Sequence, residues 1–171
     1  RALTQVLQRH EALRTTFSEE GADQLIHPAE VRLAIVDYSR LPVAERAAAV
    51  AEWLREEGGR AFDLRQGPLF TTQLLKLDAK EHLLALKAHH TVFDGWSFGV
   101  LLHELSALYN AAYGGLALTL PPALPFRSFA QTQLDHRASA AMQQHAAYWQ
   151  AQFATLPPLL DLPTERPRPA Q

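Results

Sequence analysis

The sequence predicts a mixed α+β fold, a sandwich of helices and short strands. Short apolar stretches with strand-like character lie among stretches with helical spacing, and two longer stretches near the centre of the chain form a hairpin pattern. The chain has 171 residues, of which 47% are hydrophobic and 20% charged. This length and composition suffice to bury one ordinary core, so we expect a single lobe or domain.

The first sixty residues predict a helix, three strands and a second helix. The first helix is expected over residues 2–12. Its inward side is expected to carry Leu3, Val6, Leu7 and His10. Strands are expected at residues 15–17, 24–27 and 31–36, with Gly21 in the turn between the first two. Pro42 then precedes a helix over residues 43–57, which the pair Gly58-Gly59 is expected to end.

The central hairpin is predicted from two apolar stretches, residues 69–77 and 82–90, which the polar residues 78–81 separate. Ser97 is a plausible N-cap for the helix that follows, whose apolar spacing runs to Ala112 before Gly114. A proline-containing loop and a last helix over residues 139–153 complete the lobe. Residues 156–171 are rich in proline and predict an extended connector.

Composition and charge exclude several classes of function. The net charge is −2, and lysine and arginine are scattered, so we expect no nucleic acid and no membrane surface as partner. No apolar run approaches the roughly 20 residues that span a bilayer. The chain has no cysteine, which excludes disulfides and thiolate metal sites and fits a cytoplasmic location. It begins with neither Met nor a signal-peptide pattern, as expected for a segment of a longer polypeptide.

The residues that point to chemistry are the sequence HHTVFDG at positions 89–95. If His89 and His90 end a strand, their side chains point to opposite faces, so one can reach a substrate while the other packs. An imidazole with a pKa near about 6.5 can accept a proton from an attacking amine. Asp94 is placed to bind an arginine or a backbone N–H. Gly95 allows close approach, and an N–H at a helix start can stabilise an oxyanion.

Spacing alone leaves other interpretations of this motif open. A histidine pair after a strand is often structural, and Asp-Gly is a common turn. A metal site formed by His89, His90 and Asp94 is disfavoured, because adjacent strand residues diverge and no fourth ligand has a recognisable spacing. We therefore expect no metal and no cofactor bound by this chain.

The motif and three further stretches together resemble the condensation domains of nonribosomal peptide synthetases. The matching stretches, in order, are residues 9–17 (RHEALRTTF), 62–69 (FDLRQGPL), 89–97 (HHTVFDGWS) and 162–169 (LPTERPRP). The order Trp96-Ser97 favours condensation over the related epimerisation domains. The family's first core motif has no counterpart here, and Ser128 stands where its fourth motif has aspartate.

The resemblance implies a pseudo-dimeric domain of two lobes, related to chloramphenicol acetyltransferase, with the active site in a tunnel between them. Residues 1–155 would be the N-terminal lobe, and residues 156–171 would lead to the C-terminal lobe. The implied reaction joins an acyl or peptidyl thioester on an upstream carrier protein to the aminoacyl amine on a downstream carrier. The carriers would supply the phosphopantetheine arms, and an adenylation domain would be a further partner.

The same resemblance implies roles for individual residues. His90 would be catalytic, as general base or as the group that positions the amine, and His89 structural. Asp94 would be a buried carboxylate paired with an arginine, for which Arg14 is the first candidate. Gly95 would be the oxyanion or close-approach residue.

Two alternatives to the condensation reaction remain at this stage. One is a CoA-dependent O- or N-acyltransferase of the same superfamily. The other is a non-catalytic recruitment module, which the intact histidine motif disfavours. The lobe by itself is expected to be inactive, because only one wall of the tunnel would be present.

Overall fold

The computed structural model describes residues 1–31, 33–158 and 160, in two compact units divided between Phe126 and Arg127. The predicted mixed α+β class is confirmed. The first unit contains α1 (Ala2–Arg9), a 3-10 helix η1 (Glu11–Arg14), β1 (Thr15–Phe17), β2 (Gln24–Ile26), β3 (Ala34–Asp37), α2 (Val43–Gly59), β4 (Phe70–Lys76), β5 (His82–Ala88) and α3 (Gly95–Tyr113). From the end of this unit onward lie α4 (Phe126–Arg137) and α5 (Ala140–Gln152).

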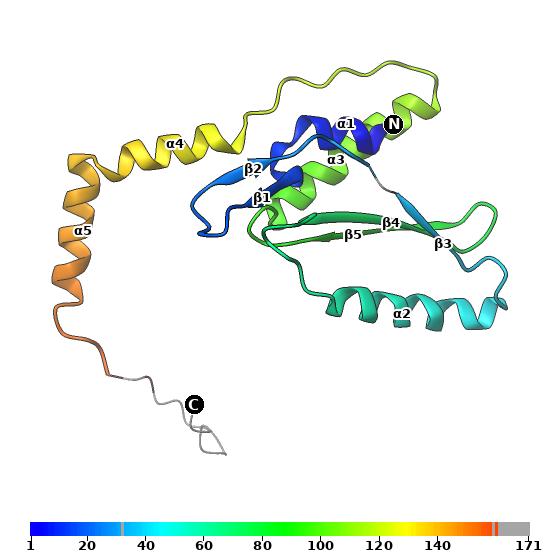
Figure 1. Cartoon of the computed structure of the whole chain (residues 1–171), viewed down its shortest axis with the longest axis horizontal. Helices are drawn as coiled ribbons and strands as arrows, with labels where there is room; N and C mark the ends of the chain where they lie inside the picture. Colours follow the sequence, from blue (N-terminus) through cyan, green and yellow to red (C-terminus); the bar gives the residue numbers. More distant parts are fainter. Residues whose placement is uncertain (32, 159, 161–171) are drawn as a thin grey trace. The chain divides into compact units, whose positions relative to one another are not determined.

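The central sheet of the first unit has the order β3-β4-β5. β3 pairs with β4 in parallel, and β4 pairs with β5 in an antiparallel register that runs from Phe70 opposite Ala88 to Lys76 opposite His82. α2 lies on one side of this sheet, and α1 and α3 lie on the other (Figure 1). β1 and β2 form a separate antiparallel pair.

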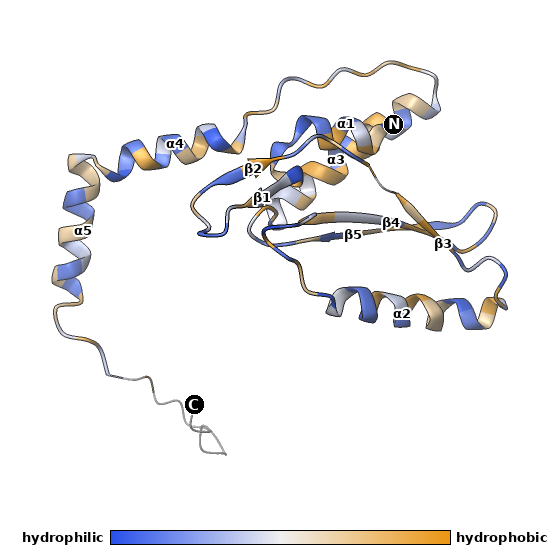
Figure 2. Cartoon of the chain, viewed as in Figure 1, coloured by the Kyte–Doolittle hydropathy of each residue, from blue (hydrophilic) through white to orange (hydrophobic). Residues whose placement is uncertain are grey.

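The main core lies between α1, α3 and the sheet face that they cover. The predicted inward side of α1 is confirmed for Leu3, Val6 and Leu7, which are buried together with Phe70 of β4 and Leu101 of α3. Complete burial of such a side chain contributes about 1.5–3 kcal/mol. Hydrophobic residues recur all along α3 (Figure 2), and several of them remain exposed at the surface of this unit.

A charged cluster ties α1 to α3 beside this core. Glu104 of α3 is buried, and both of its carboxylate oxygens accept from Arg9 Nε at 3.0 and 2.9 Å. The ring of His10 lies 2.7 Å from the same carboxylate, so His10 belongs to this cluster rather than to the apolar core. Burial alone would raise the pKa of Glu104, but the hydrogen bonds and charges of His10 and Arg9 lower it below its ordinary value.

The loop that follows α2 is anchored on β1. The N–H of Phe17 donates to Leu64 O at 2.9 Å, and Asp63 Oδ1 accepts from the main-chain N–H groups of the two residues after Leu64. Gly67 has a positive φ of 60°, and a Cβ on it would lie 2.7 Å from the methyl carbon of Thr16. Glycine is therefore required there for the loop to approach β1 this closely.

Several predicted boundaries are wrong, for local reasons. α1 ends at Arg9 instead of residue 12, because His10 is extended (φ −105°, ψ 98°). β3 begins at Ala34, since its pairing with β4 begins there, and Val31 packs against the core instead. α2 continues through Gly58 and Gly59, which were expected to end it.

The hairpin strands and the later helices also differ from prediction. β4 and β5 are shorter than the stretches 69–77 and 82–90. α4 was not predicted: its sequence lacks a clear apolar face, although Pro125 directly before it is a helix-start signal. The final helix was expected at residues 139–153, and α5 confirms it with Ser139 as its N-cap.

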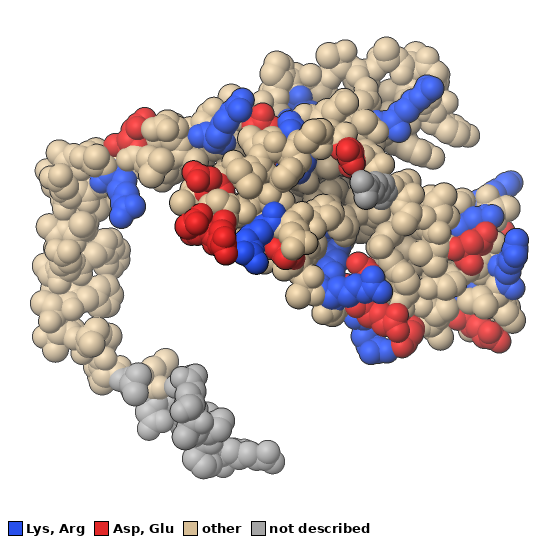
Figure 3. All heavy atoms as spheres, in the orientation of Figure 1, with Lys and Arg blue, Asp and Glu red and all other residues tan. Residues whose placement is uncertain are grey.

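Two surface properties bear on possible partners. On the face of the first unit shown in Figure 3, acidic and basic side chains are interspersed. Within the described ranges, no helix combines the length and the apolar character needed to cross a bilayer.

We predict that Glu104→Ala lowers the free energy of unfolding by about 1.5–3 kcal/mol, because it removes charge-assisted hydrogen bonds and leaves Arg9 and His10 partly buried without their acceptor. Urea unfolding followed by circular dichroism measures this change. The matched control is Glu52→Ala, which removes an exposed ion pair with Arg55 and should cost at most about 0.5 kcal/mol. Equal effects of the two substitutions would contradict the structural role of Glu104.

Candidate functional site

The histidine pair lies on a turn rather than at the end of a strand. β5 ends at Ala88, although the main-chain N–H of His89 still donates to Leu69 O at 2.8 Å. The carbonyl of His89 then accepts from the N–H of Val92 at 3.1 Å, which closes a turn over residues 89–92. The predicted strand over residues 82–90 is therefore two residues too long, and His90 and Thr91 occupy the central positions of this turn.

The side chain of His89 holds the same turn from inside. Its Nδ1 accepts from the main-chain N–H of Thr91 at 3.2 Å and lies 2.8 Å from the Thr91 hydroxyl. Because a main-chain N–H can only donate, this contact requires the Nδ1 lone pair, as in the tautomer that carries its ring proton on Nε2. The half-buried ring also meets Phe62 in an edge-to-face contact, with centroids 5.8 Å apart.

The ring of His90 lies in different surroundings. His90 is exposed and lines a cavity of about 240 Å³ whose wall includes Ala12 and Thr15 from the start of the chain and Phe93 and Ser97 from the motif region. The side chains of the two adjacent histidines thus lie in different parts of the first unit. His89 contacts the loop after α2, and His90 faces a cavity beside the start of α3.

Asp94 is the N-cap of α3, a position that was predicted for Ser97. Its side chain accepts from the main-chain N–H of Ser97 at 2.8 Å and from the Ser97 hydroxyl at 2.7 Å. Ser97 is the third residue of the helix, because the helix begins at Gly95. The N–H and hydroxyl of Ser97 lower the pKa of Asp94, with a smaller contribution from positive charge at His90. Asp94 is exposed, not the buried carboxylate that was expected.

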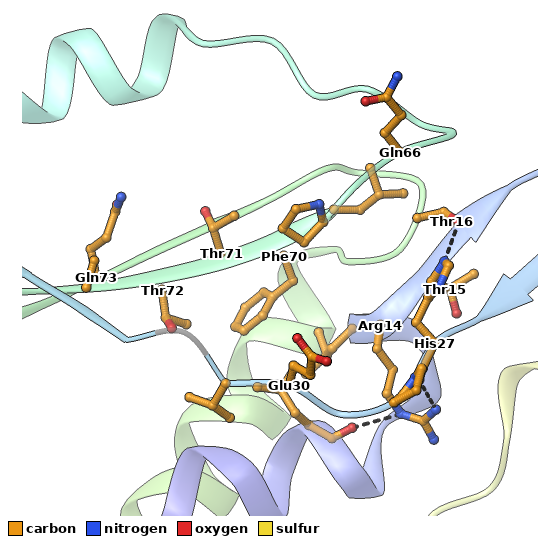
Figure 4. Close-up of a pocket in the computed structure, with 17 residues that line it drawn as sticks. Arg14, Thr15, Thr16, His27, Glu30, Gln66, Phe70, Thr71, Thr72 and Gln73 are labelled. Atoms are coloured by element: carbon orange, nitrogen blue, oxygen red, sulfur yellow. Dashed lines mark hydrogen bonds between the residues drawn. The ribbon is translucent and has the colours of Figure 1, made fainter.

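Arg14, the predicted partner of Asp94, forms its hydrogen bonds elsewhere in this structure. Arg14 donates through Nε to Leu7 O at 3.2 Å and through Nη1 to His27 O at 2.6 Å. Arg14 and His27 line a separate cavity of about 490 Å³ (Figure 4). The guanidinium thus satisfies carbonyls at the end of α1 and directly after β2.

Gly95 is the first residue of α3 and is exposed. Nothing lies within 4 Å of the position that a Cβ would take, and its φ is not positive, so neither packing nor backbone conformation within the described chain requires glycine here. The first N–H groups of a helix have no partner within the helix, and they carry partial positive charge. The start of α3 beside His90 is therefore open to an approaching group.

Two residues around His89 were not assigned to the site from the sequence. Phe62 belongs to one of the stretches that resemble the family, but its contact with His89 could not be foreseen. Lys87 is a charged residue near the end of the otherwise apolar stretch Leu83–Ala88 of β5. A charge in such a stretch indicates that the side chain has a specific partner, so the sequence did contain a signal for Lys87. In the described part of the chain, no three His, Asp or Glu side chains gather as a group that could hold a metal ion.

Comparison with known proteins gives consistent matches over the whole chain. The family model described as Condensation domain matches residues 1–171. Phosphinothricin tripeptide synthetase PhsC of Streptomyces viridochromogenes is 40% identical over 173 residues, covering 99% of this chain and 16% of that protein. Chondramide synthase cmdD of Chondromyces crocatus is 39% identical over 175 residues, covering 99% of this chain and 4% of that protein. This chain thus spans a small part of these curated relatives.

Solved structures show the same fold. The starter condensation domain of rhizomide synthetase RzmA matches with a TM-score of 0.81 and 25% identity, over 91% of this chain and 38% of that chain. The condensation enzyme VibH matches with a TM-score of 0.72 and 24% identity, over 92% of this chain and 36% of that chain. The chain therefore corresponds to about one third of each of these structures.

We predict that Asp94→Ala lowers the melting temperature more than Asp94→Asn at neutral pH, because asparagine keeps an N-cap acceptor and alanine does not. The lowered pKa means that the carboxylate's stabilisation is present above the ordinary value of 3.8 and is lost as the pH falls through the lowered pKa. The difference between wild type and Asp94→Asn should therefore shrink in acid. Thermal melts followed by circular dichroism at several pH values measure it. A difference that does not change with pH would contradict the contribution of the Asp94 charge, and equal melting temperatures of the two variants would contradict the capping role.

Proposed function

Because the chain belongs to the condensation domain family of nonribosomal peptide synthetases, we propose that it is the N-terminal lobe of a domain that forms amide bonds between carrier-bound substrates. The observation that carries the proposal is the exposed imidazole of His90, which lines a cavity beside the open start of α3. A carrier-bound aminoacyl group would present its amine to this imidazole. An acyl or peptidyl thioester on a second carrier would be the electrophile.

The bond changes can be assigned to named groups. The amine attacks the thioester carbonyl, and a C–N bond forms as the carbonyl oxygen gains negative charge. His90 takes the amine proton or holds the amine for attack. When the tetrahedral intermediate collapses, the C–S bond breaks, and the released thiolate of the donor arm receives the proton. The product amide remains attached to the acceptor carrier through its own thioester.

Gly95 is the proposed residue for close approach of the reacting carbonyl. Its N–H is at the start of α3, where the helix dipole favours negative charge. Asp94 contributes by capping this helix start through Ser97, and this keeps the first N–H groups of α3 in a fixed orientation. In this proposal Asp94 holds the start of α3 in place and does not contact the substrate.

The proposed partners follow from the same reaction. Upstream and downstream carrier proteins would supply phosphopantetheine arms, an adenylation domain would activate the amino acid, and the assembly would work in the cytoplasm. A C-terminal lobe would close the tunnel, with residues 156–171 as the connector. Most of that segment lies outside the described residues. Exposed aromatic side chains on α3, such as Trp96 (85% exposed) and Tyr109 (62%), support further packing against this lobe.

We expect His90→Ala in the full-length protein to reduce amide formation to the background rate while the fold persists, because the proton acceptor or amine-positioning group is lost. The assay follows transfer from an acyl-loaded carrier to an aminoacyl-loaded carrier by mass spectrometry. His82→Ala is the matched control, since His82 is exposed at the far end of the same strand. Unchanged turnover in His90→Ala would remove the catalytic assignment. Replacing the carrier-bound donor by the same acyl group on CoA tests the alternative acyltransferase, which predicts equal or faster transfer from CoA.

The variant Gly95→Ala distinguishes a role of Gly95 in the approach of the substrate carbonyl from a role in folding. Alanine has a higher helix propensity than glycine by about 1 kcal/mol, and the site for its Cβ is empty, so the thermal stability should stay equal or rise. Amide formation should nevertheless fall, because the added methyl group stands where the carbonyl approaches. If activity and stability both remain at wild-type values, Gly95 has no part in the reaction.

A further inference from the structure

We propose that Lys87 and Phe62 are positioning residues, which hold the ring of His89 and through it the turn that presents His90. This inference rests on the proposed function, because it concerns the placement of the same imidazole. It assigns a task to a lysine on β5 and to an aromatic residue in the loop after α2.

The first step is the end of α2, where the C-cap residue Arg60 pairs through Nη1 with Glu57 Oε2 at 3.1 Å. The last turn of α2 contains no basic residue, and the sequence Glu56-Glu57-Gly58-Gly59 places negative charge where the helix dipole is also negative. Lys87 of β5 supplies a second cation, and its Nζ also lies 3.8 Å from Glu57 Oε1. Its Nζ donates to Glu57 O at 2.5 Å and to Arg60 O at 2.7 Å.

The second step runs from Lys87 to His89. The ammonium nitrogen of Lys87 lies 4.8 Å from the centroid of the Phe62 ring, within the range of a cation–π interaction. The Phe62 ring in turn meets the His89 ring at an interplanar angle of 85°. Lys87 and His89 are two residues apart on β5 and its extension, so both side chains lie on the same face, toward α2.

The third step is that Phe62 cannot readily move away. Its loop is fixed to β1 by the hydrogen bond from Phe17 to Leu64 O, and the close approach of Gly67 to Thr16 fixes the loop farther along. On the other side, α2 is held by Lys87. The Phe62 ring is therefore placed between two anchored segments and limits the orientation of the His89 ring.

The last step links His89 to the reacting group. His89 accepts from the main-chain N–H of Thr91, the residue directly after His90. A tilt of the His89 ring would break this bond and leave the turn held by its main-chain closure alone, and a displacement of about 1 Å at a reacting group can cost roughly 100-fold in rate. Lys87 and Phe62 thus act on His90 without touching the substrate.

The test compares two disruptive variants with conservative ones in the full-length protein. Amide formation is measured with loaded donor carrier and an aminoacyl N-acetylcysteamine thioester as soluble acceptor, whose concentration can be varied. We expect Lys87→Met and Phe62→Leu each to lower kcat by about 10- to 100-fold at unchanged KM for the acceptor. Lys87→Arg should restore most of the rate, because arginine keeps the cation and the donors. The double variant should be no slower than the slower single variant, because both act through one ring.

Lys76→Met is the matched control, since Lys76 lies on the adjacent strand and its ion pair with Asp37 is exposed. A Lys87→Met protein as fast as this control would overturn the inference, and so would a slow Lys87→Arg protein or a change in KM alone. If Lys87→Met fails to fold, Phe62→Leu against wild type decides by the same criteria. His90→Ala is assayed in parallel. Normal turnover in that variant rejects the proposed function, whereas loss in His90→Ala with normal turnover in Lys87→Met and Phe62→Leu rejects only the positioning network.

Discussion

The main-chain hydrogen bonds of His89 determine the geometry of the candidate site. Its N–H completes the pairing of β5 with the segment before β4, and its carbonyl closes the turn that follows. The sheet therefore continues up to this residue in its hydrogen bonding, although its strand conformation stops one residue earlier. The exposed imidazole of His90 and the first turn of α3 are therefore placed relative to this one residue.

Charged side chains connect elements that the apolar core alone would leave adjustable. Glu104 joins α3 to the end of α1 through Arg9 and His10, and Lys87 joins β5 to the end of α2. The side chains of Glu104 and Lys87 are partly or fully buried, and each has more than one partner. Ionic contacts of this kind hold the groups in a specific geometry. The apolar packing brings the helices to the sheet, and these polar contacts select how they lie there.

Apolar patterning was sufficient to predict the fold class, the inward side of α1 and the central hairpin, because each depends on residues close in sequence. It could not distinguish Asp94 from Ser97 as the N-cap of α3, since both residue types cap helices well and they stand within one turn. It also could not place Arg14, whose partners are main-chain carbonyls that any sequence would provide. The motif identified His89 and His90, but their separate surroundings depend on Phe62 and Ala12, which are distant in sequence and whose contacts only the folded chain shows.

The turn closed by His89 and the cap provided by Asp94 together explain the spacing of the motif. The turn needs residues 89–92, and a single further residue, Phe93, leads from it to the helix cap. The number of residues from His89 to Asp94 is thus set by the hydrogen-bonded turn and by the helix cap that follows it. Inserting or deleting one residue between His89 and Asp94 would rotate α3 by about 100° about its axis relative to the sheet. For anyone who grafts or redesigns this segment, the number of residues is therefore a specification in its own right, beside the identity of His90.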